Sequence, residues 1–395
     1  MILPFNFARI PHIIFGAGKL GELYNIIPKF GNNILFVIGE SSLEKSGKWD
    51  EITSNLENKK INFSKLSISE EPSPSLIDKA TARFREKNLD SIVGIGGGSV
   101  IDAGKAISAM LTKEDSVKNY LEGVGNKKHD GEKIPCIAVP TTSGTGSEAT
   151  KNAVISEIGP DGFKKSLRHD NLIPNIAIID PELMISCPPS VSAACGMDAF
   201  TQLLESYVSP KGSPITDTLA YSGMKFISEN ILLACSTGAA DINIRSAMAY
   251  GSLISGITLA NAGLGIIHGL ASPIGGVFKI PHGVICGTLL AEATKMNVEM
   301  LQKQGPTGKL SLRKHAQIGA LITDGSPVLE QNINKYCIKL IETLKRWTNE
   351  LKIDRLGKYG IKVKDIDKIV ENVGLKNNPV HLSKENIKKI VFNRL

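Results

Sequence analysis

The chain has 395 residues, of which 42% are hydrophobic and 22% charged, enough for two folded domains with sizeable cores. Its formal net charge of +7 comes mainly from lysines spread over residues 303–394. No aromatic-basic reader motif accompanies them, so we expect no nucleic-acid partner. The six cysteines are scattered without a CxxC pair, which favours free thiols over a disulfide framework or zinc knuckle.

Two features bear on where the protein resides. The N-terminus lacks a charged segment followed by a long apolar core, so we expect no signal peptide and a cytoplasmic location. The longest stretch without charged residues, 246–278, contains several glycines, Asn261, His268 and Pro273, which suit a buried helix pair better than a bilayer span. We therefore expect no membrane partner.

The first half of the chain alternates short apolar runs with helical segments. Strands are predicted at 12–15, 33–39, 61–68, 89–99, 135–140 and 175–183, with helices at 41–57, capped by Ser41 or Ser42, and at 75–87. Alternation at these lengths predicts a parallel sheet covered by helices on both faces.

A glycine cluster, Gly96 to Ser99, follows the strand at 89–99 and opens the helical segment VIDAGKAISAM. Bare backbone N–H groups at a helix start can approach an anion, and Ser99 can cap the helix, so this loop is a predicted phosphate site. The spacing matches neither GxGxxG nor a P-loop, since Ala106 stands where a P-loop has Ser or Thr. On glycine content alone, an ordinary strand-to-helix turn without a ligand is an alternative interpretation of this loop.

A second loop of small and hydroxyl residues, TTSGTGSEAT, spans Thr141 to Thr150 after the strand at 135–140. Alone it fits an ordinary polar loop. Two such loops at the carboxyl edge of one sheet fit a ligand lying across that edge.

The character of the sequence changes near residues 184–190, where CPPS interrupts the pattern and helical periods follow. We predict an α/β domain over residues 1–185 and an all-helical domain over residues 186–395.

The stretch from Gly265 to Gly283 contains two histidines, His268 and His282, in an apolar setting. Pro273, the pair Gly275-Gly276 and Pro281 predict a helix, a tight return and a second helix, with one imidazole on each arm. Upstream, Asp198 and Gln202 stand at i and i+4 on one helical face. A single buried histidine is more often a core residue, but a carboxylate among these groups needs a partner, and a divalent cation is the predicted one.

Five ordered motifs, GGGSVIDAGKA, PTTSGTGSEAT, IIDPEL, GMDAFTQLLESYVS and GLASPIGGVFKIPHG, resemble those of the iron-containing (group III) alcohol dehydrogenases over essentially the whole chain. The resemblance implies the dehydroquinate synthase-like fold of this family and a cleft between its two domains. The implied reaction is metal-assisted hydride transfer between NAD(P) and a small alcohol or aldehyde.

The resemblance also assigns cofactor contacts. Gly97, Gly98 and Ser99 correspond to pyrophosphate contacts, and Asp102 to a residue near the nicotinamide. Thr141, Thr142 and Thr145 correspond to contacts with adenosine and phosphates, and Lys164 to a lysine that reaches the ribose.

Asp198, His268 and His282 match three of the family's four metal ligands and are the predicted catalytic groups. The fourth position holds Gln202 instead of histidine, and Ser272 replaces a histidine assigned to proton relay. An amide oxygen is a poorer ligand for iron or zinc than an imidazole, so weaker metal binding is expected. Ser272 does not titrate near neutral pH, so any relay uses its hydroxyl, the ribose or water.

The residues expected to bind the adenosine ribose of the cofactor favour NADP over NAD. The family's ribose-binding acid falls at Gly39, whose lack of a side chain removes the repulsion of a 2′-phosphate, while Ser41, Ser42 and Lys45 offer donors. Glu40 is adjacent and keeps NAD open as an alternative.

Two rival functions remain open: a metal-independent reductase or lyase-type enzyme of the same fold, and a nucleotide-binding pseudoenzyme. The intact Asp198 argues against the first. We expect a homodimer or higher homo-oligomer that pairs through the free edge of the early strand at 12–15.

Overall fold

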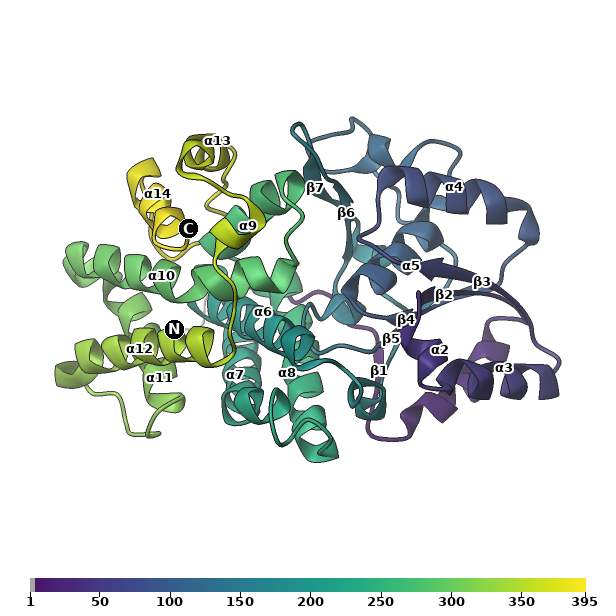
Figure 1. The fold of residues 1–395 in the computed structure, drawn as a ribbon, viewed down its shortest axis with the longest axis horizontal. Helices are drawn as coiled ribbons and strands as arrows, with labels where there is room; N and C mark the ends of the chain where they lie inside the picture. The colour runs from purple at the N-terminus through teal and green to yellow at the C-terminus, as the bar shows by residue number, and fades with distance from the viewer. Residues whose placement is uncertain (1–3) are drawn as a thin grey trace.

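The computed structural model describes residues 4–395. The chain folds into two parts, an α/β part from its first half and a helical part from its second half (Figure 1). The predicted fold class, a parallel sheet followed by an all-helical domain, is confirmed.

The α/β part is built on a six-stranded parallel sheet. In spatial order its strands are β1 (His12–Phe15), β8 (Ile176–Ile179), β5 (Cys136–Pro140), β4 (Ser91–Gly96), β2 (Asn33–Gly39) and β3 (Asn62–Ile68). The order reverses between β2 and β4, because β3 joins one side of β2 and the later strands of this sheet join the other. Such a reversal leaves a crevice at the carboxyl ends of the strands, where doubly wound sheets bind ligands.

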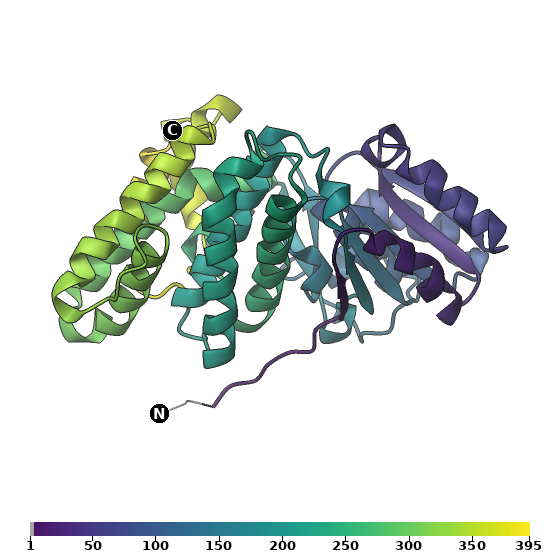
Figure 2. The same cartoon turned by 90° about the horizontal axis from the view of Figure 1, so that it is seen from below.

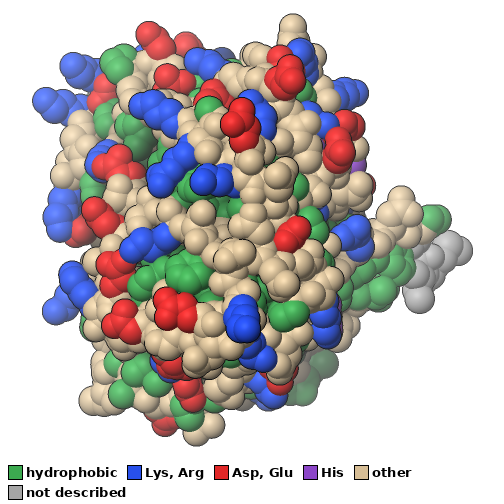
Figure 3. Space-filling model, turned by 90° about the vertical axis from the view of Figure 1, so that its right-hand side faces the viewer, with side chains coloured by type: hydrophobic (Ala, Val, Ile, Leu, Met, Phe, Trp, Pro, Cys, Tyr) green, Lys and Arg blue, Asp and Glu red, His purple; other side chains and the backbone are tan. Residues whose placement is uncertain are grey.

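Helices cover both faces of the sheet, and the central strands are buried accordingly. All six residues of β4 are buried. On one face Phe36 of β2 packs edge-on against Trp49 of α3 (Lys48–Asn58), with ring centroids 5.6 Å apart. The other face packs against α4 (Pro74–Phe84) and α5 (Gly98–Met110). On the outer end of this part, side chains of both charges are interspersed (Figure 3).

Two predicted helical segments differ in detail from the structure. The segment predicted as one helix over 41–57 forms α2 (Ser42–Lys45) and α3, because Gly47 adopts a φ of 72° and interrupts it. Ser41 is the N-cap residue of α2, but its side chain makes no capping hydrogen bond. In α5 the N-cap residue is Gly97, and Ser99 lies within the first turn.

An antiparallel hairpin between the two parts was not predicted. It consists of β6 (Asn152–Glu157) and β7 (Phe163–Arg168) and stands apart from the parallel sheet. It lies between the sheet and the helical part (Figure 1). Lys164 is on its second strand, β7.

The helical part is packed around one large apolar core, in which Phe200 meets Trp347 edge-on at 5.1 Å. Its longer helices are α6 (Pro189–Val208), α7 (Pro214–Ala234), α8 (Ile242–Ala262), α9 (Ile266–Val277), α10 (His282–Lys303), α11 (Lys309–Leu321) and α12 (Ile333–Glu350), followed by the short α13 (Ile366–Glu371) and α14 (Lys384–Phe392).

The predicted helix, return and second helix are present, but the break lies elsewhere. Helix α9 continues through Pro273 and the glycine pair after it, and only residues 278–281 leave the helix. A proline inside a helix removes one backbone hydrogen bond, and the packing of α9 against α10 and β7 outweighs that local cost. His268 therefore lies on α9, and His282 is the first residue of α10.

The N-terminal segment before β1 extends beneath the helical part (Figure 2), where Ala8 N donates to Asn261 Oδ1 of α8 at 2.6 Å. Within residues 4–395, no single helix is long and apolar enough to cross a bilayer. Helices α8 and α9 together meet that length and composition, but they are bent by 101°.

Candidate active site

A cavity of about 880 Å³ lies between the carboxyl edge of the sheet and the helical part. Its sheet-side wall includes Gly97, Gly98 and Thr142, and its helical wall includes His268 and His282. The predicted phosphate loop and the predicted metal ligands therefore share one cavity.

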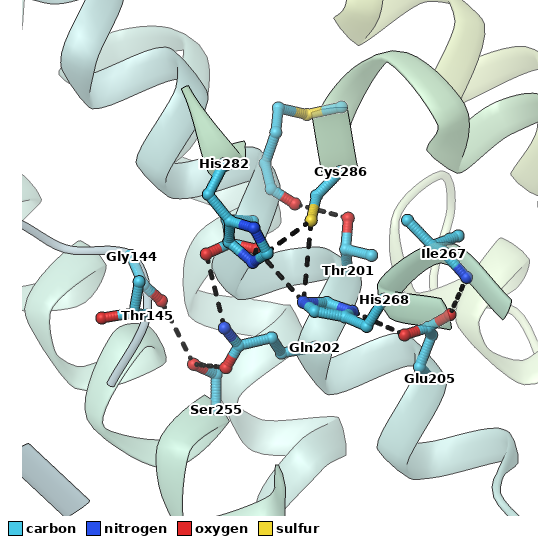
Figure 4. A network of polar contacts seen from close by, with 12 residues as sticks. Gly144, Thr145, Thr201, Gln202, Glu205, Ser255, Ile267, His268, His282 and Cys286 are labelled. Atoms are coloured by element: carbon cyan, nitrogen blue, oxygen red, sulfur yellow. Dashed lines mark hydrogen bonds and ion pairs between the residues drawn. The ribbon is translucent and has the colours of Figure 1, made fainter. Parts of the chain in front are cut away.

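Four side chains converge on one point of the helical wall: Asp198 of α6, His268 of α9, and His282 and Cys286 of α10. One ligand atom from each lies within 4.8 Å of all the others. The Nε2 atoms of His268 and His282 lie 3.4 and 3.7 Å from Asp198 Oδ1. The Cys286 Sγ lies 3.6 and 3.7 Å from the same two nitrogens. Figure 4 shows the two imidazoles and the thiol pointing toward one another.

Asp198 is 1% exposed, and its Oδ1 atom makes no hydrogen bond of acceptable geometry, although both imidazoles are near. A buried carboxylate oxygen without a partner is costly. A divalent cation would satisfy it, with Asp198, His268 and His282 as the residues that would hold the ion, and oxygen and imidazole ligands suit iron or zinc. The residues present therefore fit the predicted metal.

Charge balance leads to the same conclusion. Burial raises the pKa of Asp198, but the imidazoles of His282 and His268 outweigh it and bring that pKa to about 2. Burial opposes protonation of His268, yet its contacts with Cys286 and Asp198 raise its pKa well above the ordinary value. Burial also raises the pKa of Cys286 to about 12. Asp198 is thus held as an anion beside two imidazoles, a charge that a bound cation would also stabilise.

Glu205, one turn beyond Gln202 on α6, orients His268. Its Oε2 lies 2.7 Å from His268 Nδ1, and its Oε1 accepts from the backbone N–H of Ile267 at 2.7 Å. A carboxylate on one ring nitrogen of a metal-binding histidine fixes the tautomer and directs the other nitrogen to the metal. Here that other nitrogen is Nε2, which faces Asp198 Oδ1.

Gln202 reaches the opposite oxygen of Asp198, with Nε2 at 3.4 Å from Oδ2. Its Oε1 lies 3.0 Å from Ser255 Oγ (Figure 4), whose hydroxyl also lies 2.8 Å from Ser252 O. The side chain lines the cavity with its amide oxygen toward Ser255. Ser272 also lines the cavity, and its hydroxyl donates to the carbonyl of Lys164 at 2.7 Å.

The two loops at the sheet edge lie against each other. Thr141 N donates to Gly96 O at 2.9 Å. A Cβ added at Gly98 would lie 2.6 Å from Thr145 Oγ1, and one at Gly97 would lie 3.5 Å from Thr142 Oγ1. With Gly97 at the N-cap of α5, bare backbone is presented at a helix start, the arrangement that binds phosphate.

The other predicted cofactor residues are distributed around this edge. The Asp102 carboxylate accepts from Val154 N at 3.0 Å and pairs with Lys105 at 2.9 Å. Lys164 pairs with Glu71 at the cavity wall. Gly39 is the last residue of β2 and pairs with Ile68, which lines the cavity, and Ser41 lies two residues further on. Gly39 and Ser41 themselves do not line the cavity.

Sequence reasoning missed Glu205, Cys286 and Glu71. Two of them had a signal in their spacing: Glu205 follows Asp198 by seven residues on one helix, and Cys286 follows His282 by four. Glu71 had none, because it meets Lys164 only through the tertiary fold.

A phosphate-binding sheet edge and a cluster of cation ligands in one cavity define a metal-assisted dehydrogenase that uses a dinucleotide. Known proteins agree with this class. Two family models match in succession, "Iron-containing alcohol dehydrogenase" over residues 11–181 and "Fe-containing alcohol dehydrogenase family, C-terminal" over residues 192–395. The chain belongs to the iron-containing alcohol dehydrogenase family. The predicted family and enzyme class are thereby confirmed.

Individual relatives cover nearly the whole chain. Long-chain-alcohol dehydrogenase 1 of Geobacillus thermodenitrificans is 33% identical over 90% of this chain and 86% of its own length. The NADPH-dependent butanol dehydrogenase of Clostridium saccharobutylicum is 30% identical over 96% and 95%. The NAD-dependent methanol dehydrogenase of Bacillus methanolicus is 28% identical over 99% and 100%. A solved 1,3-propanediol oxidoreductase superposes with a TM-score of 0.87 at 28% identity and covers 100% of both chains.

Proposed function

We propose that this alcohol dehydrogenase transfers hydride between NADP and a small alcohol or aldehyde, assisted by a divalent cation, iron or zinc. The observation that carries the proposal is the single cavity shared by the glycine edge at Gly97-Gly98 and the cluster around Asp198. Nicotinamide dependence is supported by the relatives, whose names include both an NADPH-dependent and an NAD-dependent enzyme.

Asp198, His268 and His282 are the proposed metal ligands and catalytic groups. When bound, the cation polarises a carbonyl oxygen or lowers the pKa of a bound alcohol. Asp198 supplies the negative charge, and Glu205 holds His268 with Nε2 toward the site. The Gln202 amide N–H faces Oδ2 of Asp198, whereas the two histidines face Oδ1, so Gln202 helps to position that carboxylate.

The cofactor contacts follow the sheet edge. Gly97, Gly98 and Ser99 are proposed to bind the pyrophosphate at the start of α5, and Thr142 and Thr145 to contact the phosphates beside them. Three further positions complete the proposal: Thr141 toward adenosine, Asp102 toward the nicotinamide and Lys164 toward the ribose. Because Lys164 pairs with Glu71, a ribose hydroxyl there shares the ammonium group with that carboxylate.

The preference for NADP rests on Gly39 at the end of β2. A Cβ built at Gly39 would have Ser42 Oγ as its nearest neighbour, at 3.5 Å, so the position has room that glycine leaves open. Without an acid at this point, nothing at position 39 repels a 2′-phosphate, and Ser41 and Ser42 are available as donors.

Further parts of the proposal concern organisation. We assign residues 1–185 to nucleotide binding and residues 186–395 to metal and substrate binding. The outer edge of β1 is unpaired in the sheet order and is the proposed contact in a homodimer or higher homo-oligomer. A cytoplasmic location, with neither nucleic acid nor membrane as partner, completes the proposal.

The function is tested by metal analysis and an aldehyde series with NADPH and NADH. We expect one divalent cation per chain and reductase activity that a chelator removes. His268→Ala and His282→Ala should each abolish alcohol oxidation while NADPH still binds, as measured by quenching or enhancement of its fluorescence. Full activity in both variants would mean that the cluster is not catalytic.

The same assays separate the two rival functions. A metal-independent reductase keeps its turnover after chelation, and a pseudoenzyme binds NADPH without turning over any aldehyde. The buried Oδ1 of Asp198, which has no hydrogen-bond partner, supports the metal-dependent enzyme over both.

A further inference from the structure

We propose that Cys286 is the fourth protein ligand of the cation, in the place left by the histidine that Gln202 replaces, and that its thiolate favours zinc over iron. The inference rests on the proposed metal-dependent function and concerns which atoms hold the metal.

Four of the six distances between the ligand atoms match the edges of a tetrahedral site, and the other two are within 4.8 Å. Metal–nitrogen and metal–oxygen bonds of about 2.1 Å and metal–sulfur bonds of about 2.3 Å give edges of about 3.4 Å between nitrogen and oxygen and about 3.6 Å between nitrogen and sulfur. Here the two imidazole Nε2 atoms lie 3.4 and 3.7 Å from Asp198 Oδ1 and 3.6 and 3.7 Å from Cys286 Sγ.

The thiol of Cys286 is placed by the helix that carries His282. The two residues are four positions apart at the start of α10, so they share one face, and α9 brings His268 against them. The polar contacts of the Cys286 thiol are with imidazole nitrogens. In contrast, the buried thiol of Cys337 donates to the backbone carbonyl of Leu312, as a structural cysteine does.

Gln202 is placed differently. The cluster converges on Oδ1 of Asp198, whereas the Gln202 amide lies against Oδ2. An amide N–H toward the carboxylate is the favourable orientation, because the reverse sets two acceptor oxygens against each other in a buried place. In this orientation the amide oxygen points to Ser255 and away from the cluster.

A sulfur ligand changes which metal the site prefers. Thiolate is a soft ligand that suits zinc, whereas carboxylate and imidazole alone leave iron and zinc closer in affinity. On metal binding the thiol proton is released to solvent and the sulfur–metal bond forms, without any change in oxidation state.

The test is the absorption spectrum of the full-length apoprotein reconstituted with Co²⁺ alone. A sulfur-to-cobalt charge-transfer band in the near ultraviolet reports a thiolate ligand, whether or not the enzyme turns over. We expect this band in the wild type, in Gln202→Ala and in the matched control Cys337→Ser. In Cys286→Ser the band should be lost, while the visible cobalt bands remain and the affinity for Co²⁺ falls at least tenfold. The ratio of zinc to iron affinity should fall by a similar factor.

The possible failures are distinguishable. Cobalt bound at one ion per chain without a sulfur band in the wild type would overturn the role of Cys286 and leave the proposed function standing. A band that persists in Cys286→Ser would place the thiolate elsewhere and overturn it as well. No bound cobalt at all would overturn both. The wild-type spectrum decides the matter even if Cys286→Ser folds poorly.

Discussion

Glu205 Oε2 and His268 Nδ1 lie 2.7 Å apart in the core of the helical part, and this contact sets the direction of the His268 ring. The same carboxylate holds the backbone of Ile267, so it fixes both the ring and the start of α9. Glu205 touches neither the cation position nor the cofactor edge, and we regard it as a positioning residue.

Changing Glu205 should therefore weaken metal binding without removing the site. In Glu205→Gln the hydrogen bond is kept and the charge is lost, so the affinity for Zn²⁺ should fall by about 10–100-fold, the usual effect of removing such a partner. Competition with a coloured chelator measures this, with the exposed Glu229→Gln on α7 as the control. Equal affinity in all three proteins would show that the carboxylate has no influence on the metal.

A side chain at Gly98 should interfere with cofactor binding. In Gly98→Ala the new methyl group would lie 2.6 Å from Thr145 Oγ1, so Thr145 must shift at the point where the two loops meet. We expect NADPH affinity to fall by about tenfold or more, equivalent to ~1.4 kcal/mol. Gly104→Ala on the same helix is the control, since its methyl group would meet Gly94 Cα at an ordinary 3.7 Å. Fluorescence titration with NADPH compares the variants, and the idea fails if Gly98→Ala binds as the wild type does.

An acid at position 39 should convert the cofactor preference. Gly39→Asp restores the carboxylate that hydrogen-bonds a free ribose and repels a 2′-phosphate. The ratio of kcat/KM with NADPH to that with NADH should fall by at least about tenfold, ~1.4 kcal/mol of differential binding. Gly21→Asp adds the same charge at an exposed position of the same part and should leave the ratio unchanged. A wild type that already prefers NADH by this factor would identify Glu40 as the ribose partner.

Glu148 should make folding stability depend on pH. This side chain is 2% exposed, and burial raises its pKa from 4.5 to about 7. An acid whose pKa is higher in the folded than in the unfolded state contributes its full stability below its unfolded pKa. That contribution is lost as the pH rises through the pKa of the folded state. Relative to the wild type, Glu148→Gln should gain roughly 1–3 kcal/mol above about pH 7.

Urea unfolding of both proteins over a pH series measures this difference in the free energy of unfolding. The two curves should converge as the pH approaches the ordinary range of a glutamate. A gap that stays constant with pH would mean that Glu148 is not the titrating group.

Much of the fold could be predicted because its strands are continuous apolar runs. The segment NILFVIG is buried on both faces in β2, and the glycines after β4 mark the helix start at the sheet edge. The hairpin β6–β7 could not be found in this way, since one face of it lines the cavity with mostly polar residues and β7 carries two lysines in a row. Its contacts with Asp102 and Glu71 join residues that are distant in sequence.

The site shows the same division between local and tertiary information. Asp198, His268 and His282 could be selected because acid and imidazole groups are conspicuous in apolar helices. Cys286 had only its spacing from His282 as a signal, because a buried cysteine is chemically ordinary until a second helix brings another imidazole to it. The orientation of the Gln202 amide group likewise depends on Ser255, a residue of another helix.

The hairpin has a mechanical consequence for the enzyme. Two hydrogen bonds join it to the helical part: Gly159 N donates to Gly276 O at 3.1 Å, and Lys368 Nζ donates to Pro160 O at 3.0 Å. One hydrogen bond joins it to α5 of the α/β part: Val154 N donates to the Asp102 carboxylate at 3.0 Å. The hairpin thus bridges the two parts at one wall of the cavity, and we expect it to restrain any movement of one part against the other.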